Sequence, residues 1–139
     1  MLLIMSAACL VLADQLTKAL AARLLADQRS VRLSPHIYLC YAKNTFGVAG
    51  VPSKRSALLI LWGVAFITLV LVVWDGRLFH HSAARVALGA ALGGATSNLY
   101  DRLRRGGVID LVKVSWWPVF NLADVGITAG AIAAIWFIR

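Results

Sequence analysis

Long apolar stretches separated by shorter polar segments dominate the chain. The clearest stretch, 56–74, has no charged residue, and its length suits a helix that crosses a hydrocarbon core of roughly 30 Å. Three further stretches combine apolar content with helical periodicity, at approximately 1–22, 83–100 and 119–138. The pattern therefore predicts four transmembrane helices, with both chain ends on one side of the membrane.

The segment 23–55 has a different character from the predicted spans. Charges, Pro35 and Pro52 interrupt it, and short β-favouring pieces occur within 30–41. Asn44 and the glycines near it predict a flexible loop. This loop is either a plain connection or a segment that binds a peptide. The predicted fold class is an all-α integral membrane protein: a four-transmembrane-helix bundle with a small extramembrane β-sheet between helices 1 and 2, forming a single membrane domain over 1–139.

Composition agrees with a membrane protein. Hydrophobic residues make up 60% of the chain and the mean hydropathy is +0.78. Fourteen Lys and Arg against six acids give a formal charge of +8, which suits an anionic lipid surface. Because no nucleic-acid-binding motif stands out, membrane lipids rather than nucleic acid are the predicted partner.

The acidic residues converge on one predicted layer of the membrane protein. Asp101, Asp110 and Asp124 all lie within 93–124, and a carboxylate at membrane depth is costly enough to suggest a functional site. Asp14 and Asp124 lie thirteen and fifteen residues from the nearer chain end, which places both roughly 20 Å from the terminal face at about 1.5 Å per residue. Four acids are thus expected just inside the opposite face.

Asparagines accompany two of these acids. Asn98 and Asp101 are three residues apart, as are Asn121 and Asp124, so that each pair is expected to share a helix face. A nearby Asp110 would oppose double ionisation with Asp124, and two such carboxylates can share one proton. This is an arrangement by which two aspartates activate a water for amide hydrolysis.

Three interpretations of the polar layer stay open on this evidence: a structural role, with Arg102 pairing with Asp101 or Asp110; a proton or ion pathway in a non-enzymatic membrane protein; and hydrolysis. Asp14 and Lys18 are four residues apart and can pair, either as an interfacial ion pair or as a support for a site. The sequence has no HExxH metal motif and no serine in a nucleophile-elbow context. Metal and serine hydrolases are therefore disfavoured.

At these residues the chain resembles the lipoprotein signal peptidase (signal peptidase II) family. DQLTK at 14–18 is similar to the family's first-helix motif. SNLYDRLRRGGVIDL at 97–111 resembles its GNxxDRxxxGxVxDF signature, and FNLAD at 120–124 resembles FNxAD. The motifs occur in the family's order over nearly the whole chain.

The resemblance implies an aspartic endopeptidase of the bacterial plasma (inner) membrane. Such an enzyme removes the signal peptide from a prolipoprotein by cleaving before its diacylglyceryl-modified cysteine, without a metal or other cofactor, and we expect it to act as a monomer. By position, the resemblance makes Asp110 and Asp124 catalytic. It implies substrate-binding or supporting roles for Asn44, Asn98, Asp101, Arg102, Asn121, Asp14 and Lys18.

Several positions depart from the family pattern: Ser97 stands where glycine is usual, and Val125-Gly126 where Ser-Ala is usual. Asn44 matches the first position of an N-x-G-A-x-[FW] element, but the glycine expected two positions later is Phe46. Leu111 stands where phenylalanine is usual. These positions neighbour the predicted site without replacing its acids, so activity is expected, with an altered substrate preference as one outcome.

The charge distribution conflicts with the orientation that the resemblance implies. Eleven of the fourteen Lys and Arg fall on the face with the acids, which leaves Arg77, Arg85 and Arg139 on the other face. This bias favours a cytoplasmic position for the acids, whereas the resemblance implies an extracytoplasmic one. The prediction follows the resemblance.

Overall fold

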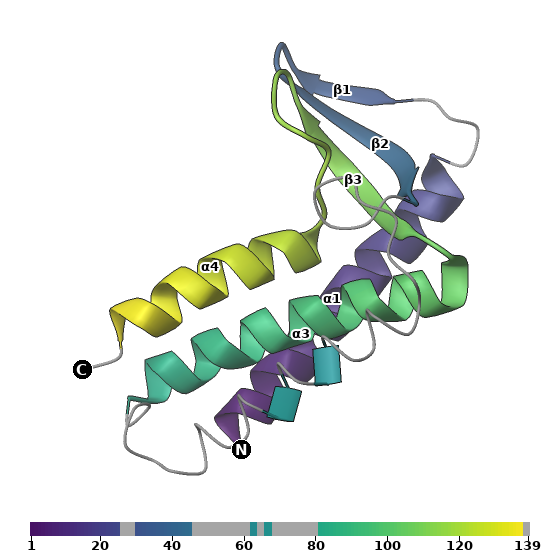
Figure 1. Cartoon of the computed structure of the whole chain (residues 1–139). Helices are drawn as coiled ribbons and strands as arrows, with labels where there is room; N and C mark the ends of the chain where they lie inside the picture. The colour runs from purple at the N-terminus through teal and green to yellow at the C-terminus, as the bar shows by residue number, and fades with distance from the viewer. Residues whose placement is uncertain (26–29, 46–61, 64–65, 68–80, 138–139) are drawn as a thin grey trace.

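The computed structural model describes residues 1–25, 30–45, 62–63, 66–67 and 81–137. Its long helices are α1 (Leu2–Leu24), α3 (Ser82–Arg105) and α4 (Leu122–Trp136), and its strands are β1 (Val31–Ser34), β2 (Ile37–Asn44) and β3 (Val108–Val114). The sheet lies at one end of the helices, and both chain ends lie away from it (Figure 1). This arrangement agrees with termini on one face and the acids near the other.

The helices match three of the four predicted spans, with shifted ends. α1 is long and apolar enough to cross a membrane, and α4 is a shorter apolar helix. α3 continues past its predicted end to Arg105, because Gly106 supplies a left-handed C-cap (φ 70°) and basic residues suit the last turn. The predicted span 56–74 lies outside the described residues, except for 62–63 and 66–67, which are helical.

Small residues let α3 pack closely against both other helices. A Cβ at Gly93 would overlap the backbone of Ala7 in α1, and one at Gly94 would overlap the carbonyl oxygen of Ala123 in α4. The close approach predicted from the small residues of α3 is therefore confirmed. It brings the first turn of α4 against α3 at the level where the acidic residues lie.

The sheet is antiparallel, with strand order β1-β2-β3. Its third strand corrects the prediction, which confined the sheet to the segment between the first two spans and left Asp110 in a connection. The sequence after Gly107 (VIDLVKV) is rich in β-branched residues, and it pairs with β2 so that Ala42 lies opposite Asp110. Asp110 is therefore held in a paired strand.

Candidate active site

Asp110 is a buried carboxylate on β3, with 4% of its surface exposed. Its Oδ1 accepts a hydrogen bond from Asn121 Nδ2 at 3.0 Å. Its Oδ2 accepts a longer one from Asn44 Nδ2 at 3.4 Å. The structure thus brings two of the predicted supporting residues, from β2 and from the start of α4, to this carboxyl group.

Asn121 connects the two predicted catalytic acids. It is the N-cap of α4: its side chain accepts a hydrogen bond from Asp124 N at 2.9 Å, and Asp124 Oδ2 accepts one from Asn121 N at 3.1 Å. This reciprocal capping box fixes Asp124 in the first turn of the helix. Asn121 was predicted to share a helix face with Asp124, but it precedes the helix, and its Nδ2 faces Asp110 instead.

Asn98 completes the contacts of Asp124. Asn98 Nδ2 donates to Asp124 Oδ1 at 2.8 Å, and its Oδ1 accepts from Lys18 Nζ at 3.3 Å. Both carboxyl oxygens of Asp124 therefore accept hydrogen bonds from N–H donors, one from the Asn98 side chain and one from the Asn121 backbone. Lys18 and the capping box together orient the hydrogen bonds around this acid.

A buried cluster of charged side chains contacts the first turn of α4, next to Asp124. Lys18 Nζ lies 2.5 Å from Asp14 Oδ2 and 2.7 Å from Asp101 Oδ2, and none of the three side chains is exposed. Asp14 Oδ1 accepts from Ala123 N at 2.9 Å, next to Asp124. The predicted pairing of Asp14 with Lys18 is confirmed, and the cluster joins α1, α3 and the first turn of α4.

The cluster also contains residues that the sequence analysis missed. Asp101 pairs with Lys18 and with the Arg105 guanidinium, where the predicted partner was Arg102. Ser97 Oγ donates to Asp14 Oδ2 at 2.6 Å. Gln15 donates to both Ser97 and Asp101. The four-residue spacing of Asp101 and Arg105 was a usable signal, whereas the contacts of Gln15 depend on the packing of α1 against α3.

Burial and a neighbouring negative charge raise the pKa of Asp110 above that of an ordinary aspartate. Burial, and then the negative charge of Asp124, raise the pKa of Asp110 from 3.8 to about 6, against the opposing effects of the Asn44 and Asn121 hydrogen bonds and of Lys18. Asp110 therefore keeps its proton at mildly acidic pH beside a carboxylate that accepts hydrogen bonds on both oxygens. The arrangement can supply one general acid and one general base.

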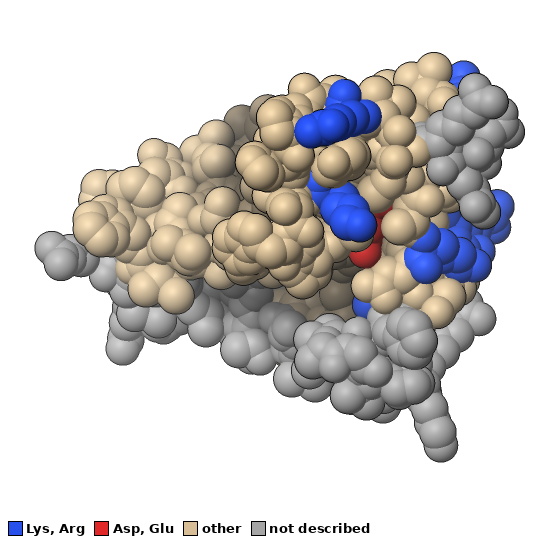
Figure 2. Space-filling model, turned by 90° about the horizontal axis from the view of Figure 1, so that it is seen from above, with Lys and Arg blue, Asp and Glu red and all other residues tan. Residues whose placement is uncertain are grey.

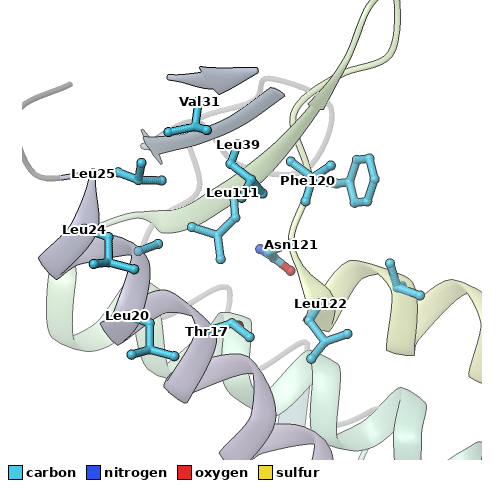
Figure 3. A pocket seen from close by; sticks show the side chains of 13 residues that line it. Thr17, Leu20, Leu24, Leu25, Val31, Leu39, Leu111, Phe120, Asn121 and Leu122 are labelled. Atoms are coloured by element: carbon cyan, nitrogen blue, oxygen red, sulfur yellow. The ribbon is translucent and has the colours of Figure 1, made fainter. Parts of the chain in front are cut away.

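An apolar cavity of about 540 Å³ opens beside this pair (Figure 3). Leucines of α1, β2 and β3 line it together with Phe120, and Asn121 brings a polar group to its wall. A second hollow, of about 350 Å³, is lined by Asp124 together with Trp117 and Phe120. Apolar ligand chains can therefore reach the polar groups of the site. Within the described residues, no group of three or more His, Cys, Asp or Glu could hold a metal ion.

Known proteins are similar to this chain over the whole region that contains the site. A family model described as signal peptidase (SPase) II matches residues 6–139. The lipoprotein signal peptidase of Pelotomaculum thermopropionicum is 36% identical over 137 residues, covering 98% of this chain and 90% of that protein. That of Syntrophomonas wolfei is 35% identical over 124 residues, covering 88% and 82%. A bacterial membrane enzyme solved by the in meso method at 2.3 Å resolution matches with a TM-score of 0.84 and 27% identity, covering 96% of this chain and 84% of that one.

Proposed function

This chain belongs to the signal peptidase II family, and from that membership we propose that it removes the signal peptide from diacylglyceryl-modified prolipoproteins, cleaving before the lipidated cysteine. The observation that carries the proposal within the site is the joint contact of Asp110 and Asp124 with Asn121. We propose these two acids as the catalytic pair of an aspartic endopeptidase.

The proposed reaction divides the roles between the two acids. Asp124 takes a proton from water as the water oxygen attacks the carbonyl carbon of the scissile bond, and Asp110 gives its proton to the carbonyl oxygen. Asp124 then passes its proton to the amide nitrogen, the C–N bond breaks, and Asp110 regains a proton from the collapsing diol. The raised pKa of Asp110 and the two N–H donors on Asp124 support this division.

The remaining polar residues have supporting roles in this proposal. Asn121 and Asn98 hold the two carboxyls through the hydrogen bonds already described, and Asn44 reaches Asp110 from the sheet. Arg102, half-buried near the end of α3, is a candidate for contact with the substrate. We propose that the apolar cavities beside the acids receive the lipid and the apolar signal-peptide residues of the prolipoprotein.

We further propose a four-span monomer formed by a single membrane domain over 1–139, with 56–74 as the second span. Its active site would lie near the extracytoplasmic face of the bacterial plasma membrane. The outward-facing apolar side chains of α1 support contact with lipid, among them Leu12 (63% exposed) and Leu16 (62%). Cys40 lies on β2 near the acids, so that a membrane-impermeant thiol reagent is expected to label it in intact cells. Labelling only after permeabilisation would contradict this orientation.

The decisive experiment is reconstitution of the purified chain in liposomes with a diacylglyceryl-modified prolipoprotein. We expect a cut immediately before the lipidated cysteine, detected by mass spectrometry of the released signal peptide. The unlipidated precursor, with the same peptide sequence, serves as the matched control and is expected to stay uncut. Absence of cleavage together with a pH-dependent conductance of the liposomes would favour a proton pathway instead.

A further inference from the structure

Two exposed cations lie at the corner where α3 leads into β3. Arg104 is in the last turn of α3, and Lys43 is near the end of β2. A Cβ at Gly106 would lie 3.8 Å from Lys43 Nζ, and one at Gly107 would lie 3.2 Å from Lys43 Cε. The Lys43 side chain therefore extends over the two glycines that follow α3, close to the helix turn that carries Arg104. We call Lys43 and Arg104 the corner pair.

Neither cation of the corner pair has an acidic partner among the described residues. The ion pairs in this part of the chain all involve Asp14 or Asp101, which are buried. Asp110 is buried as well, and Asp124 is only partly exposed. Seen from the sheet end, Lys and Arg are prominent, whereas only a small acidic surface is visible (Figure 2). The corner pair thus presents positive charge that the described acids do not compensate.

The corner pair lies at the level expected for lipid headgroups. In the proposed four-span arrangement α3 crosses the membrane, and Tyr100, which is 48% exposed, lies four residues before Arg104 on the same helix face. Tyrosine favours the boundary between hydrocarbon and water, and four residues advance a helix by about 6 Å. Arg104 is therefore placed just outside this boundary, where the phosphate groups of lipids lie.

We propose that an anionic phospholipid binds the corner pair through its phosphate group and thereby raises the activity of the peptidase. This inference rests on the proposed function and on the proposed crossing of the membrane by α3. The Arg104 guanidinium offers paired N–H donors to phosphate oxygens, and the Lys43 ammonium adds a second positive charge. Such binding also gives a role to cations on the acid-bearing face, where the positive-inside tendency disfavours them in the proposed orientation.

Short stretches of chain link the corner pair to Asp110. Asn44, next to Lys43, donates to Asp110 Oδ2 at 3.4 Å, and β3, which carries Asp110, begins two residues after Gly106. A phosphate that contacts both cations holds the end of β2 against the corner from which β3 starts. Asn44 and Asp110 are thereby fixed relative to each other, so the lipid is expected to act mainly on kcat.

The alternative role of the corner pair is to complement the negative end of the α3 dipole. That role depends only on the peptide groups of the helix. It predicts that removal of the two cations has the same effect in neutral and in anionic membranes. A lipid site instead predicts an effect that is confined to anionic membranes.

The test uses the full chain in vesicles of phosphatidylcholine, with and without phosphatidylglycerol, and one lipidated prolipoprotein. A cation near an anionic surface changes affinity roughly fivefold, and we expect phosphatidylglycerol to raise kcat/KM by roughly 3- to 10-fold. The double variant Lys43→Gln/Arg104→Gln should keep the rate in neutral vesicles and lose most of this increase. Arg32→Gln/Lys113→Gln removes two exposed cations of the sheet outside the corner. It is the matched control and should retain the increase.

A direct measurement of lipid binding accompanies the kinetics. Native mass spectrometry of the protein purified in detergent with phosphatidylglycerol is expected to show the lipid retained by the unmodified protein and by the control. The corner variant should retain much less of it. Equal retention by the corner variant would contradict the assignment of the site.

Three kinetic outcomes would overturn the inference. They are no increase with phosphatidylglycerol, an equal increase in the corner variant, and an equal loss of rate by the corner variant in both kinds of vesicle. If soluble glycerol 3-phosphate raised the rate in neutral vesicles as much as the lipid does, the corner would be a site for free phosphate esters and the lipid assignment would be wrong. Cleavage by the unmodified protein in neutral vesicles tests the proposed function separately, because that function holds whether or not anionic lipid raises the rate.

Discussion

Asp110→Asn and Asp124→Asn are each expected to abolish cleavage of a lipidated prolipoprotein, with a loss of roughly 10³-fold or more. Neither amide can exchange a proton with water or with the leaving amine, so each variant lacks one of the two proton-transfer groups. The measurement is the initial rate of signal-peptide release in liposomes at matched protein concentration.

Asparagine preserves the size of each side chain, so both variants are expected to fold and insert. At Asp110 the amide oxygen can still accept the Asn121 hydrogen bond. Asp75→Asn changes an acid of the predicted loop on the other membrane face, and it should leave the rate unchanged. Turnover retained by either site variant would contradict the assignment of the catalytic pair.

The pKa of Asp110 also gives the direction of the pH dependence. An acid with a pKa of about 6 is protonated below that pH and ionised above it, so kcat/KM of the unmodified protein is expected to fall as pH rises through about 6. Because an ordinary aspartate loses its proton near 3.8, the folded state binds more protons than the unfolded state between these values. Stability should therefore fall with rising pH across that window, and Asp110→Asn should remove this part of the fall.

Lys18→Met is expected to lower the free energy of unfolding by about 3–5 kcal/mol, because it leaves Asp14 and Asp101 as buried carboxylates without their shared cation. It should also lower activity, since Asn98 loses the donor that orients its amide toward Asp124. Thermal or denaturant unfolding in detergent measures the first effect, and the liposome assay measures the second.

Two further variants make this expectation specific to the buried cluster. Lys43→Met removes an exposed lysine of β2, and its effect should stay within about 0.5 kcal/mol. Adding Asp14→Asn to Lys18→Met removes one of the two stranded charges, so the double variant should be less destabilised than the sum of the two single variants. Unchanged unfolding of Lys18→Met would show that the cluster does not stabilise the fold.

The sequence by itself determined the features that depend on local spacing. Length and hydropathy predicted α1, α3 and α4, because a helix that faces lipid needs a long apolar run. The four-residue spacing of Asp14 and Lys18 predicted their ion pair, which the structure confirms. The motifs around Asp110 and Asp124 predicted the family, which the comparisons confirm.

Only the tertiary structure decided how distant segments meet. Nothing in the local pattern of 108–114 specifies β2 as its partner, and so the strand that carries Asp110 was predicted as a connection. The contact of Lys18 with Asp101 requires α1 to pack against α3. The bridge from Asn121 to Asp110 requires the start of α4 to meet the sheet. The strand pairing and the Lys18–Asp101 contact join residues far apart in the chain, and all three contacts depend on how the helices and the sheet are placed relative to one another, which local spacing does not specify.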